Sequence, residues 1–152
     1  MAEQDKRAYI FGALFILANR LQYLGDQFDD EITLKQWGLL AVLSTFEGNS
    51  ASIGQVANFM GTSGQNVKKM ALILERKGFL TLQVDEKDSR SIRLIVTQKA
   101  MEHAKGREVR EEVFLQKLYQ GMDEELLSAM CKGLRKIEEN MKQLEEETKK
   151  DN

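Results

Sequence analysis

Five polar or basic side chains that could read nucleic-acid bases stand close together just before the middle of the chain. They are Ser63, Gln65, Asn66, Lys68 and Lys69. Gln and Asn can form paired hydrogen bonds with the edge of adenine, and Lys can reach guanine or a phosphate. The same residues could instead be the ordinary solvated face of a helix that opens with a capping Gln. The elements around them decide between the two.

A second group of charged side chains lies in the polar stretch 85–90 and just behind it. Arg90 is long and cationic, and Asp88 can hold its guanidinium group by a charge-assisted hydrogen bond. Such a side chain fits the narrow minor groove of DNA, where negative potential is concentrated. Lys87 and Arg93 are predicted to contact phosphates, which position a protein without specifying sequence. The alternative is that Arg90 forms only a weak surface ion pair.

Catalytic and metal chemistry lack the residues they need. His103 and Cys131 are the only His and Cys of the chain, so a His-based metal site, a Ser-His-Asp triad and a Cys-His pair all lack partners. The run 61–64 contains two glycines, but no Lys-Ser or Lys-Thr follows it, as a phosphate-binding loop requires. Cys131 is predicted to be a small buried hydrophobe, with a redox switch as the alternative. We expect neither an enzyme nor a cofactor.

Apolar residues at helical spacing predict two helices at the start of the chain, over 5–28 and 34–46. Thr33 and Gln36 have the spacing of a capping box at the start of the second helix. Gly48, followed by Asn, supplies the left-handed stop behind it. Both ends of the second helix are therefore marked by residue type as well as by periodicity.

The same capping pattern recurs twice, in the pairs Ser52–Gln55 and Thr62–Gln65. The first pair opens a short helix that Gly61 ends. The second opens a longer helix that Gly78 ends. A short helix, a tight turn and a longer helix have the spacing of a helix-turn-helix, which places the five polar residues on the exposed first turns of a recognition helix.

The pattern changes after this unit from helical spacing to alternation. Residues 80–84 and 92–96 alternate between apolar and other side chains, and a polar stretch separates them, which predicts a β-hairpin. Thr97 then caps a helix that runs to about Tyr119, and Asp123 caps a final helix with one apolar stripe. A hairpin directly behind a helix-turn-helix favours a winged unit that binds DNA.

This order of elements resembles the MarR family of bacterial transcriptional regulators, and the resemblance covers nearly the whole chain. Asp88 and Arg90 match the family's Asp-x-Arg pattern in the wing, ahead of a strand that ends in the Leu-Thr-like run 94–97. The chain departs from the common pattern at three positions, Gly64, Glu86 and Ser89. We expect a mainly helical winged helix-turn-helix fold with a two-stranded hairpin as its wing.

The resemblance implies one domain over 1–152, with a DNA-binding lobe at about 33–97 and dimerisation helices at about 5–28 and 98–147. In this family, a pocket between the lobe and the dimerisation helices commonly accepts small aromatic or phenolic anions. The candidate wall residues in this chain are Phe11, Phe15 and Trp37. Aromatic residues at helical spacing can equally be core residues, and packing of both terminal helices within one monomer is the alternative to a dimer.

The net charge of −2 is a sum of two opposed parts. Residues 50–99 hold eight Lys and Arg against four Asp and Glu, a net charge of +4, so the remaining residues carry −6. A basic winged unit on acidic helices would orient the molecule on DNA. With no apolar run of membrane length and no pair of cysteines, we expect a soluble cytoplasmic protein without a membrane partner.

Together these features predict a homodimeric, sequence-specific DNA-binding regulator of transcription. We expect a repressor whose partner is a palindromic double-stranded operator and which a small-molecule effector releases. Two alternatives stay open: a transcriptional activator of the same fold, and a helical interaction module whose winged unit binds a protein partner.

Overall fold

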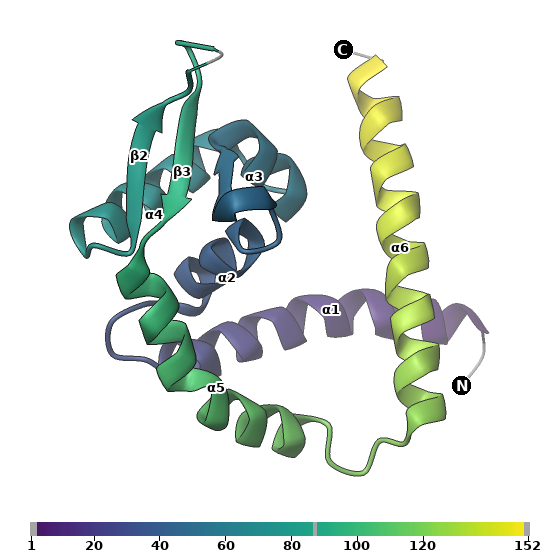
Figure 1. Cartoon of the computed structure of the whole chain (residues 1–152). Coiled ribbons are helices and arrows are strands. Elements are labelled where there is room, and N and C mark those ends of the chain that lie inside the picture. Colours follow the sequence, from purple (N-terminus) through teal and green to yellow (C-terminus); the bar gives the residue numbers. More distant parts are fainter. Residues whose placement is uncertain (1–2, 87, 151–152) are drawn as a thin grey trace. The chain divides into compact units, whose positions relative to one another are not determined.

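The computed structural model describes residues 3–86 and 88–150 (Figure 1). In chain order the elements are α1 (Glu3–Asp26), α2 (Leu34–Leu43), a 3-10 turn (Glu47–Asn49), β1 (Ser50–Ser52), α3 (Ile53–Met60), α4 (Gly64–Arg76), β2 (Leu80–Val84), β3 (Ile92–Val96), α5 (Gln98–Leu118) and α6 (Glu124–Lys150). The chain forms two compact units, whose boundary falls within α5 between Gly106 and Arg107. The predicted fold is confirmed: the chain is mainly helical, and a hairpin of β2 and β3 follows α3 and α4, which a short turn joins.

Side chains cap the starts of α2 and α3 as predicted. The Thr33 hydroxyl accepts the Gln36 N–H at 3.3 Å, and the Gln36 side-chain oxygen accepts the Thr33 N–H at 3.2 Å. Ser52 and Gln55 form the same reciprocal pair at the start of α3. Each box satisfies two backbone groups that the first turn of a helix leaves without intrahelical partners.

The start of α4 differs from the prediction by one residue. Ser63 has the extended backbone of a cap, and its hydroxyl accepts the Asn66 N–H at 3.2 Å. Thr62 belongs instead to the turn behind Gly61, which ends α3 in the left-handed conformation. The predicted capping box of Thr62 with Gln65 is therefore wrong.

The segment behind α2 also differs from the prediction. α2 ends at Leu43 and not at residue 46, because the backbone is already extended at Phe46 with ψ 150°. Gly48 and Asn49 take the predicted left-handed conformation, with φ values of 66° and 50°, but in the 3-10 turn that follows. This turn leads directly into β1, a strand that the sequence did not predict.

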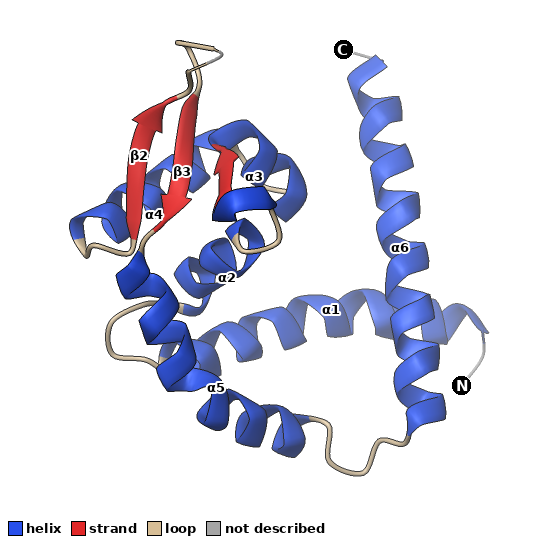
Figure 2. Cartoon of the chain, in the orientation of Figure 1, coloured by secondary structure: helices blue, strands red, loops and turns tan. Residues whose placement is uncertain are grey.

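The three strands form one antiparallel sheet in the order β1-β3-β2 (Figure 2). β3 is the central strand, and its Leu94 lies opposite Ala51 of β1 and Leu82 of β2. Leu94 and Ala51 are fully buried. The predicted hairpin thus gains a third strand, which anchors the base of a ribbon that would be marginal alone.

The core of the first unit lies between the sheet and the helices α2, α3 and α4. Its largest fully buried side chains are Leu39, Leu43, Val56, Val67, Leu74, Phe79 and Leu94. Full burial of each such side chain stabilises the fold by about 1.5–3 kcal/mol. The core therefore holds α3, α4 and the hairpin in one rigid arrangement.

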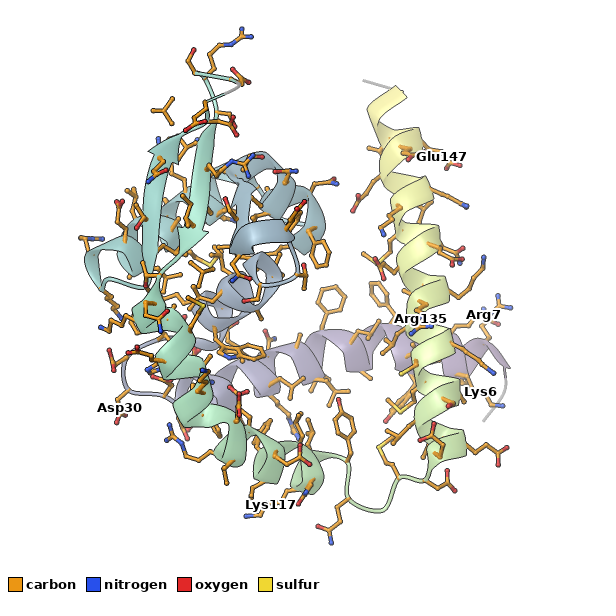
Figure 3. The ribbon with its side chains drawn as sticks, in the orientation of Figure 1. Lys6, Arg7, Asp30, Lys117, Arg135 and Glu147 are labelled. Carbon is orange, nitrogen blue, oxygen red and sulfur yellow. The ribbon has the colours of Figure 1, made fainter. Side chains whose placement is uncertain are left out.

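Apolar side chains on the long helices are, by contrast, widely exposed in the single chain. On α1 these include Tyr9, Phe11, Phe15, Ile16 and Leu17, and on α6 they include Leu126, Met130, Leu134, Met141 and Leu144. Charged side chains such as Arg135 and Glu147 also project from α6 (Figure 3).

Cys131 is exposed, so the prediction that it is buried is wrong for the single chain. None of the helices in the described ranges is long and apolar enough for a membrane crossing.

Candidate nucleic-acid interface

α4 presents one polar face to solvent and anchors the other in the core. The buried face consists of Val67, Ala71 and Leu74, each with no exposed surface. The predicted reading residues Ser63, Gln65, Asn66, Lys68 and Lys69 are all exposed. A recognition helix needs this division, because the first turns must reach base edges while the helix keeps a fixed orientation.

The first turn of α4 holds one of these side chains in place. The Asn66 side-chain amide donates to the Thr62 hydroxyl at 3.3 Å, while the Asn66 N–H donates to Ser63. This arrangement preorients the amide of Asn66 before any ligand arrives. The turn between α3 and α4 therefore takes part in the geometry of the site.

The loop between β2 and β3, residues 85–91, projects beyond the strands (Figure 1). The side chain of Arg90 in this loop is 93% exposed, and its Nε atom lies 3.6 Å from Oδ1 of Asp88. The same oxygen accepts the Arg90 N–H at 3.0 Å, so Asp88 shapes the loop as well as facing the guanidinium group. An ion pair this exposed is weak, so it does little to hold the Arg90 side chain in one position. Lys87 lies outside the described residues.

Arg93 is placed differently from Arg90. Its Nη2 and Nε atoms lie 2.9 and 3.0 Å from Oδ2 of Asp85, and its Nη1 atom lies 3.4 Å from the Ser50 hydroxyl. The exposed fractions of the Arg93 and Asp85 side chains are 38% and 11%. Arg93 thus lies where the strands meet the loop, and it joins β3 to Asp85, directly behind β2, and to Ser50 of β1. The sequence predicted a phosphate contact for this residue.

A further contact joins the recognition helix directly to the hairpin. Oε1 of Glu75, near the end of α4, accepts the N–H of Leu82 in β2 at 3.0 Å. Sequence reasoning missed this contact, because Glu75 has the appearance of an ordinary solvent-facing acid in the last turn of a helix. It fixes the angle between α4 and the hairpin in addition to the apolar core.

Sequence reasoning also missed a polar cluster behind the site. Asp29, in the segment between α1 and α2, is only 3% exposed and lies 2.7 Å from Nε2 of His103 in α5. Burial opposes ionisation of Asp29, but hydrogen bonds from His103 and from the N–H groups of Glu31 and Ile32 hold its pKa below the usual value. The His103 ring also packs edge-to-face on Phe79, with centroids 5.1 Å apart.

Two lysines of the basic segment join this cluster. Nζ of Lys99 lies 3.3 Å from Oε2 of Glu31, donates to the Lys77 carbonyl at 2.9 Å and stands 4.4 Å from the centre of the Phe79 ring. The Lys77 ammonium group donates to the Glu31 carbonyl. Lys99 thus ties α5 to the residue behind α4, and both lysines contact Glu31 in the segment between α1 and α2.

The three candidate pocket residues are not equivalent in the structure. Phe11 and Phe15 are 66% and 62% exposed on α1 and contact each other edge-to-face, with centroids 5.2 Å apart. Trp37 is partly buried and packs against the core. A shallow hollow of about 360 Å³ lies on α1, but its lining consists of Asn19, Arg20, Tyr23 and Leu24.

Residues 31–91 match the family model described as MarR family. The matched region runs from the start of α2 to the end of the loop between β2 and β3, and it holds all the candidate DNA-reading residues except Arg93. The chain is also 30% identical over 105 residues to the transcriptional activatory protein BadR of Rhodopseudomonas palustris. That alignment covers 67% of this chain and 59% of BadR, so the chain spans less than two thirds of this relative's length.

Solved structures share the fold over most of the chain. Sco3205 of Streptomyces coelicolor, a MarR family transcriptional regulator solved in complex with DNA, superposes with a TM-score of 0.80 at 14% identity, covering 90% of this chain and 88% of Sco3205. BpsR of Bordetella bronchiseptica, whose DNA binding is regulated by 6-hydroxynicotinic acid, gives a TM-score of 0.73 at 18% identity, covering 85% of this chain and 92% of BpsR.

Proposed function

Since the chain belongs to the MarR family, we propose that it is a sequence-specific DNA-binding regulator of transcription. One observation carries the proposal: the exposed polar turns of α4 and the exposed Arg90 loop are held by the same buried core. A helix in the major groove and a basic side chain in the minor groove are complementary ways of reading one stretch of duplex.

Each residue has a distinct role in this proposal. Gln65 and Asn66 read base edges, and Lys68 and Lys69 bind guanine or phosphate. Arg90 enters the minor groove, where the narrow walls concentrate negative potential. Ser63 and Lys87 complete the contact surface at the helix start and in the loop. Asp88 keeps the Arg90 backbone in the shape of the loop.

We propose that the working unit is a homodimer. α1 and α6 each expose a series of large apolar side chains in the single chain, and exposed apolar surface of this kind is typical of an interface. The helices at about 5–28 and 98–147 would form the dimer, and the lobe at about 33–97 would face DNA. Two-fold symmetry then calls for a palindromic operator whose half-sites lie about one helical turn apart.

We propose first that the protein acts in the cytoplasm and represses transcription, because a dimer bound to an operator blocks access to that stretch of DNA. The similarity to BadR, a transcriptional activatory protein, favours activation as the second candidate. Transcription from a promoter that carries the operator, measured with and without the protein, separates the two. Higher output with the protein would establish activation.

A small aromatic or phenolic anion is the proposed effector, by analogy with the regulation of BpsR by 6-hydroxynicotinic acid. Phe11, Phe15 and Trp37 are the proposed wall residues. Such a ligand can release DNA only by as much as it prefers the conformation that does not bind DNA. Titration of 6-hydroxynicotinate into a protein–DNA complex tests this point directly.

Selection of bound sequences from random duplex DNA tests the main proposal. We expect a palindrome with half-sites about 10 base pairs apart, centre to centre. Binding should also lose orders of magnitude in affinity between about 50 and 200 mM salt. No enrichment, or an affinity that is insensitive to salt, would favour a wing that binds a protein partner.

A further inference from the structure

We propose that Arg93 is a positioning residue that fixes the direction of the DNA-binding loop, and that it does not itself bind phosphate. The inference rests on the proposed function, because it concerns how Arg90 is presented to DNA. It replaces the role that residue type alone suggested for Arg93. The pair of Arg93 with Asp85 at the base of the loop carries the argument.

The guanidinium group of Arg93 joins three segments of the sheet at the end that carries the loop. Arg93 stands on the central strand β3, Asp85 directly follows β2, and Ser50 opens β1. Two nitrogen atoms of the group face Oδ2 of Asp85 at 2.9 and 3.0 Å, and the third reaches the Ser50 hydroxyl at 3.4 Å. The planar fork of Arg presents several donors in fixed directions on separate nitrogen atoms, whereas the ammonium group of Lys is a compact point charge on a flexible stem.

The bridge lies at the last backbone pairing before the loop. The Asp85 N–H donates to the Ser91 carbonyl at 2.9 Å, and beyond this pair no ladder bond joins the two strands in the described part of the loop. A two-stranded ribbon twists freely unless something holds its base. Arg90 lies beyond this point in the loop. A small rotation of the backbone at Asp85 therefore moves the guanidinium group of Arg90 by a larger distance.

Charge and burial argue against a phosphate contact by Arg93. Its charge is already paired with Asp85, whose side chain is only 11% exposed. A phosphate that drew Arg93 away would leave a largely buried carboxylate without this cation, which is unfavourable. Arg90, with 93% of its side chain exposed, has no such constraint.

The variant Asp85→Asn tests the inference, because a phosphate contact and a positioning role of Arg93 predict opposite changes in DNA affinity. If Arg93 bound phosphate, loss of the acid would release its charge and tighten DNA binding. If Arg93 positions the loop, the variant should bind about tenfold more weakly, as expected for a coupled pair, although it carries one negative charge fewer. Glu86→Gln is the matched control, because it removes the same charge one residue away and should bind as tightly as wild type or tighter.

Arg93→Lys separates fork geometry from charge. Lys is a good phosphate ligand, so a phosphate contact would survive the change with nearly wild-type affinity. The positioning role predicts a loss similar to that of Asp85→Asn, with an unchanged slope of log affinity against log salt, because no released counterion is lost. Wild-type-like affinity of Arg93→Lys, or a shallower slope, would overturn the inference.

A nitroxide label in the loop supplies a readout that a general loss of stability would not move. The label is attached at Ser89→Cys in a Cys131→Ser background, and its mobility is measured below the melting temperature of every variant. We expect Asp85→Asn and Arg93→Lys to raise label mobility and Glu86→Gln to leave it unchanged. Equal mobility in all of them would overturn the positioning role. Failure of the wild type to bind any DNA would overturn the proposed function itself and is distinguishable from either result.

Discussion

Nε2 of His103 lies 2.7 Å from Oδ2 of Asp29, and this pair links α5 to the segment between α1 and α2. Asp29 also accepts the N–H groups of Glu31 at 2.8 Å and Ile32 at 3.1 Å. The buried carboxylate of Asp29 thus accepts hydrogen bonds from the segment before α2 and also contacts His103 in the first turns of α5. The first turns of α5 are therefore held by a polar contact as well as by the ring of Phe79.

Asp29→Asn should reduce the acid sensitivity of the protein. The folded-state pKa of Asp29 lies below its ordinary value of 3.8, so the carboxylate stabilises the fold fully above that value. This stabilisation is lost as the pH falls through the lower folded-state pKa. Between about pH 4.5 and 2.5, the free energy of unfolding from urea titrations should fall less steeply with acid in the variant. Equal steepness in both proteins would contradict this account.

Gly25→Ala should destabilise the fold. A Cβ atom at Gly25 would stand 2.8 Å from side-chain atoms of Leu34, the first residue of α2. Such overpacking costs typically about 1–3 kcal/mol, which should lower the melting temperature by several degrees. Gly12→Ala is the control within the same helix, because its Cβ would meet nothing within 4 Å. That change should leave stability unchanged or raise it, and equal effects of the two would refute the close approach of α1 to α2.

Arg90→Ala should weaken operator binding at least about tenfold, or about 1.4 kcal/mol, with a nearly unchanged melting temperature. The side chain is 93% exposed and its pair with Asp88 adds little stability. Fluorescence anisotropy with the selected operator and a thermal melt measure the two quantities. Arg135→Ala, which removes the same charge from α6, should retain wild-type affinity, and unaltered affinity of Arg90→Ala would exclude the minor-groove role.

Gln65→Ala and Lys68→Ala should affect DNA binding in different ways. Loss of a base-reading Gln should relax the sequence preference at one position of each half-site, at a cost of about 1–3 kcal/mol. Loss of a phosphate-binding Lys should weaken all sequences alike and reduce the salt slope by about 1 per contact. Repeating the sequence selection with each variant, together with salt titrations, distinguishes them. Identical selected motifs for Gln65→Ala and wild type would remove Gln65 from the reading set.

Leu134→Glu should shift the protein toward monomer. Leu134 is 49% exposed in the single chain on the apolar stripe of α6, so a charge there would be buried at the proposed dimer interface. Sedimentation at micromolar concentration should give twice the chain mass of 17.4 kDa for the wild type and the chain mass for the variant. Lys132→Glu, on an exposed position of the same helix, is the control. A wild type that sediments as a monomer would contradict the dimer.

Local signals in the sequence were sufficient for most element boundaries. The capping boxes at Thr33 and Ser52 depend on residues three positions apart, so the chain reveals them directly. The start of α4 was misplaced because Thr62 and Ser63 are adjacent hydroxyl residues, and only the turn geometry decides which one caps. β1 is three residues of Ser and Ala without a strand signal, and it exists because β3 pairs with it.

The contacts that organise the site were beyond sequence reasoning because their partners are distant in the chain. Asp29 and His103 are 74 positions apart, and Ser50 and Arg93 are 43 apart. Residue type alone predicted a minor-groove role for Arg90 and a phosphate contact for Arg93, but it did not predict that the Arg90 side chain is 93% exposed while Arg93 pairs with Asp85. Only the fold distinguishes a basic residue within the loop from one on the strand that leads out of it.

The hydrogen bond from Leu82 to Glu75 has a consequence for how the protein behaves at high concentration. β2 is an outer strand of the sheet, and an open strand edge can pair with the edge of another molecule. Glu75 occupies this edge with a charged side chain, and the opposite edge is β1, only three residues long. Neither side of the sheet offers a long template for intermolecular strand pairing. The proposed association of two copies through their helices would therefore meet little competition from strand pairing at these edges.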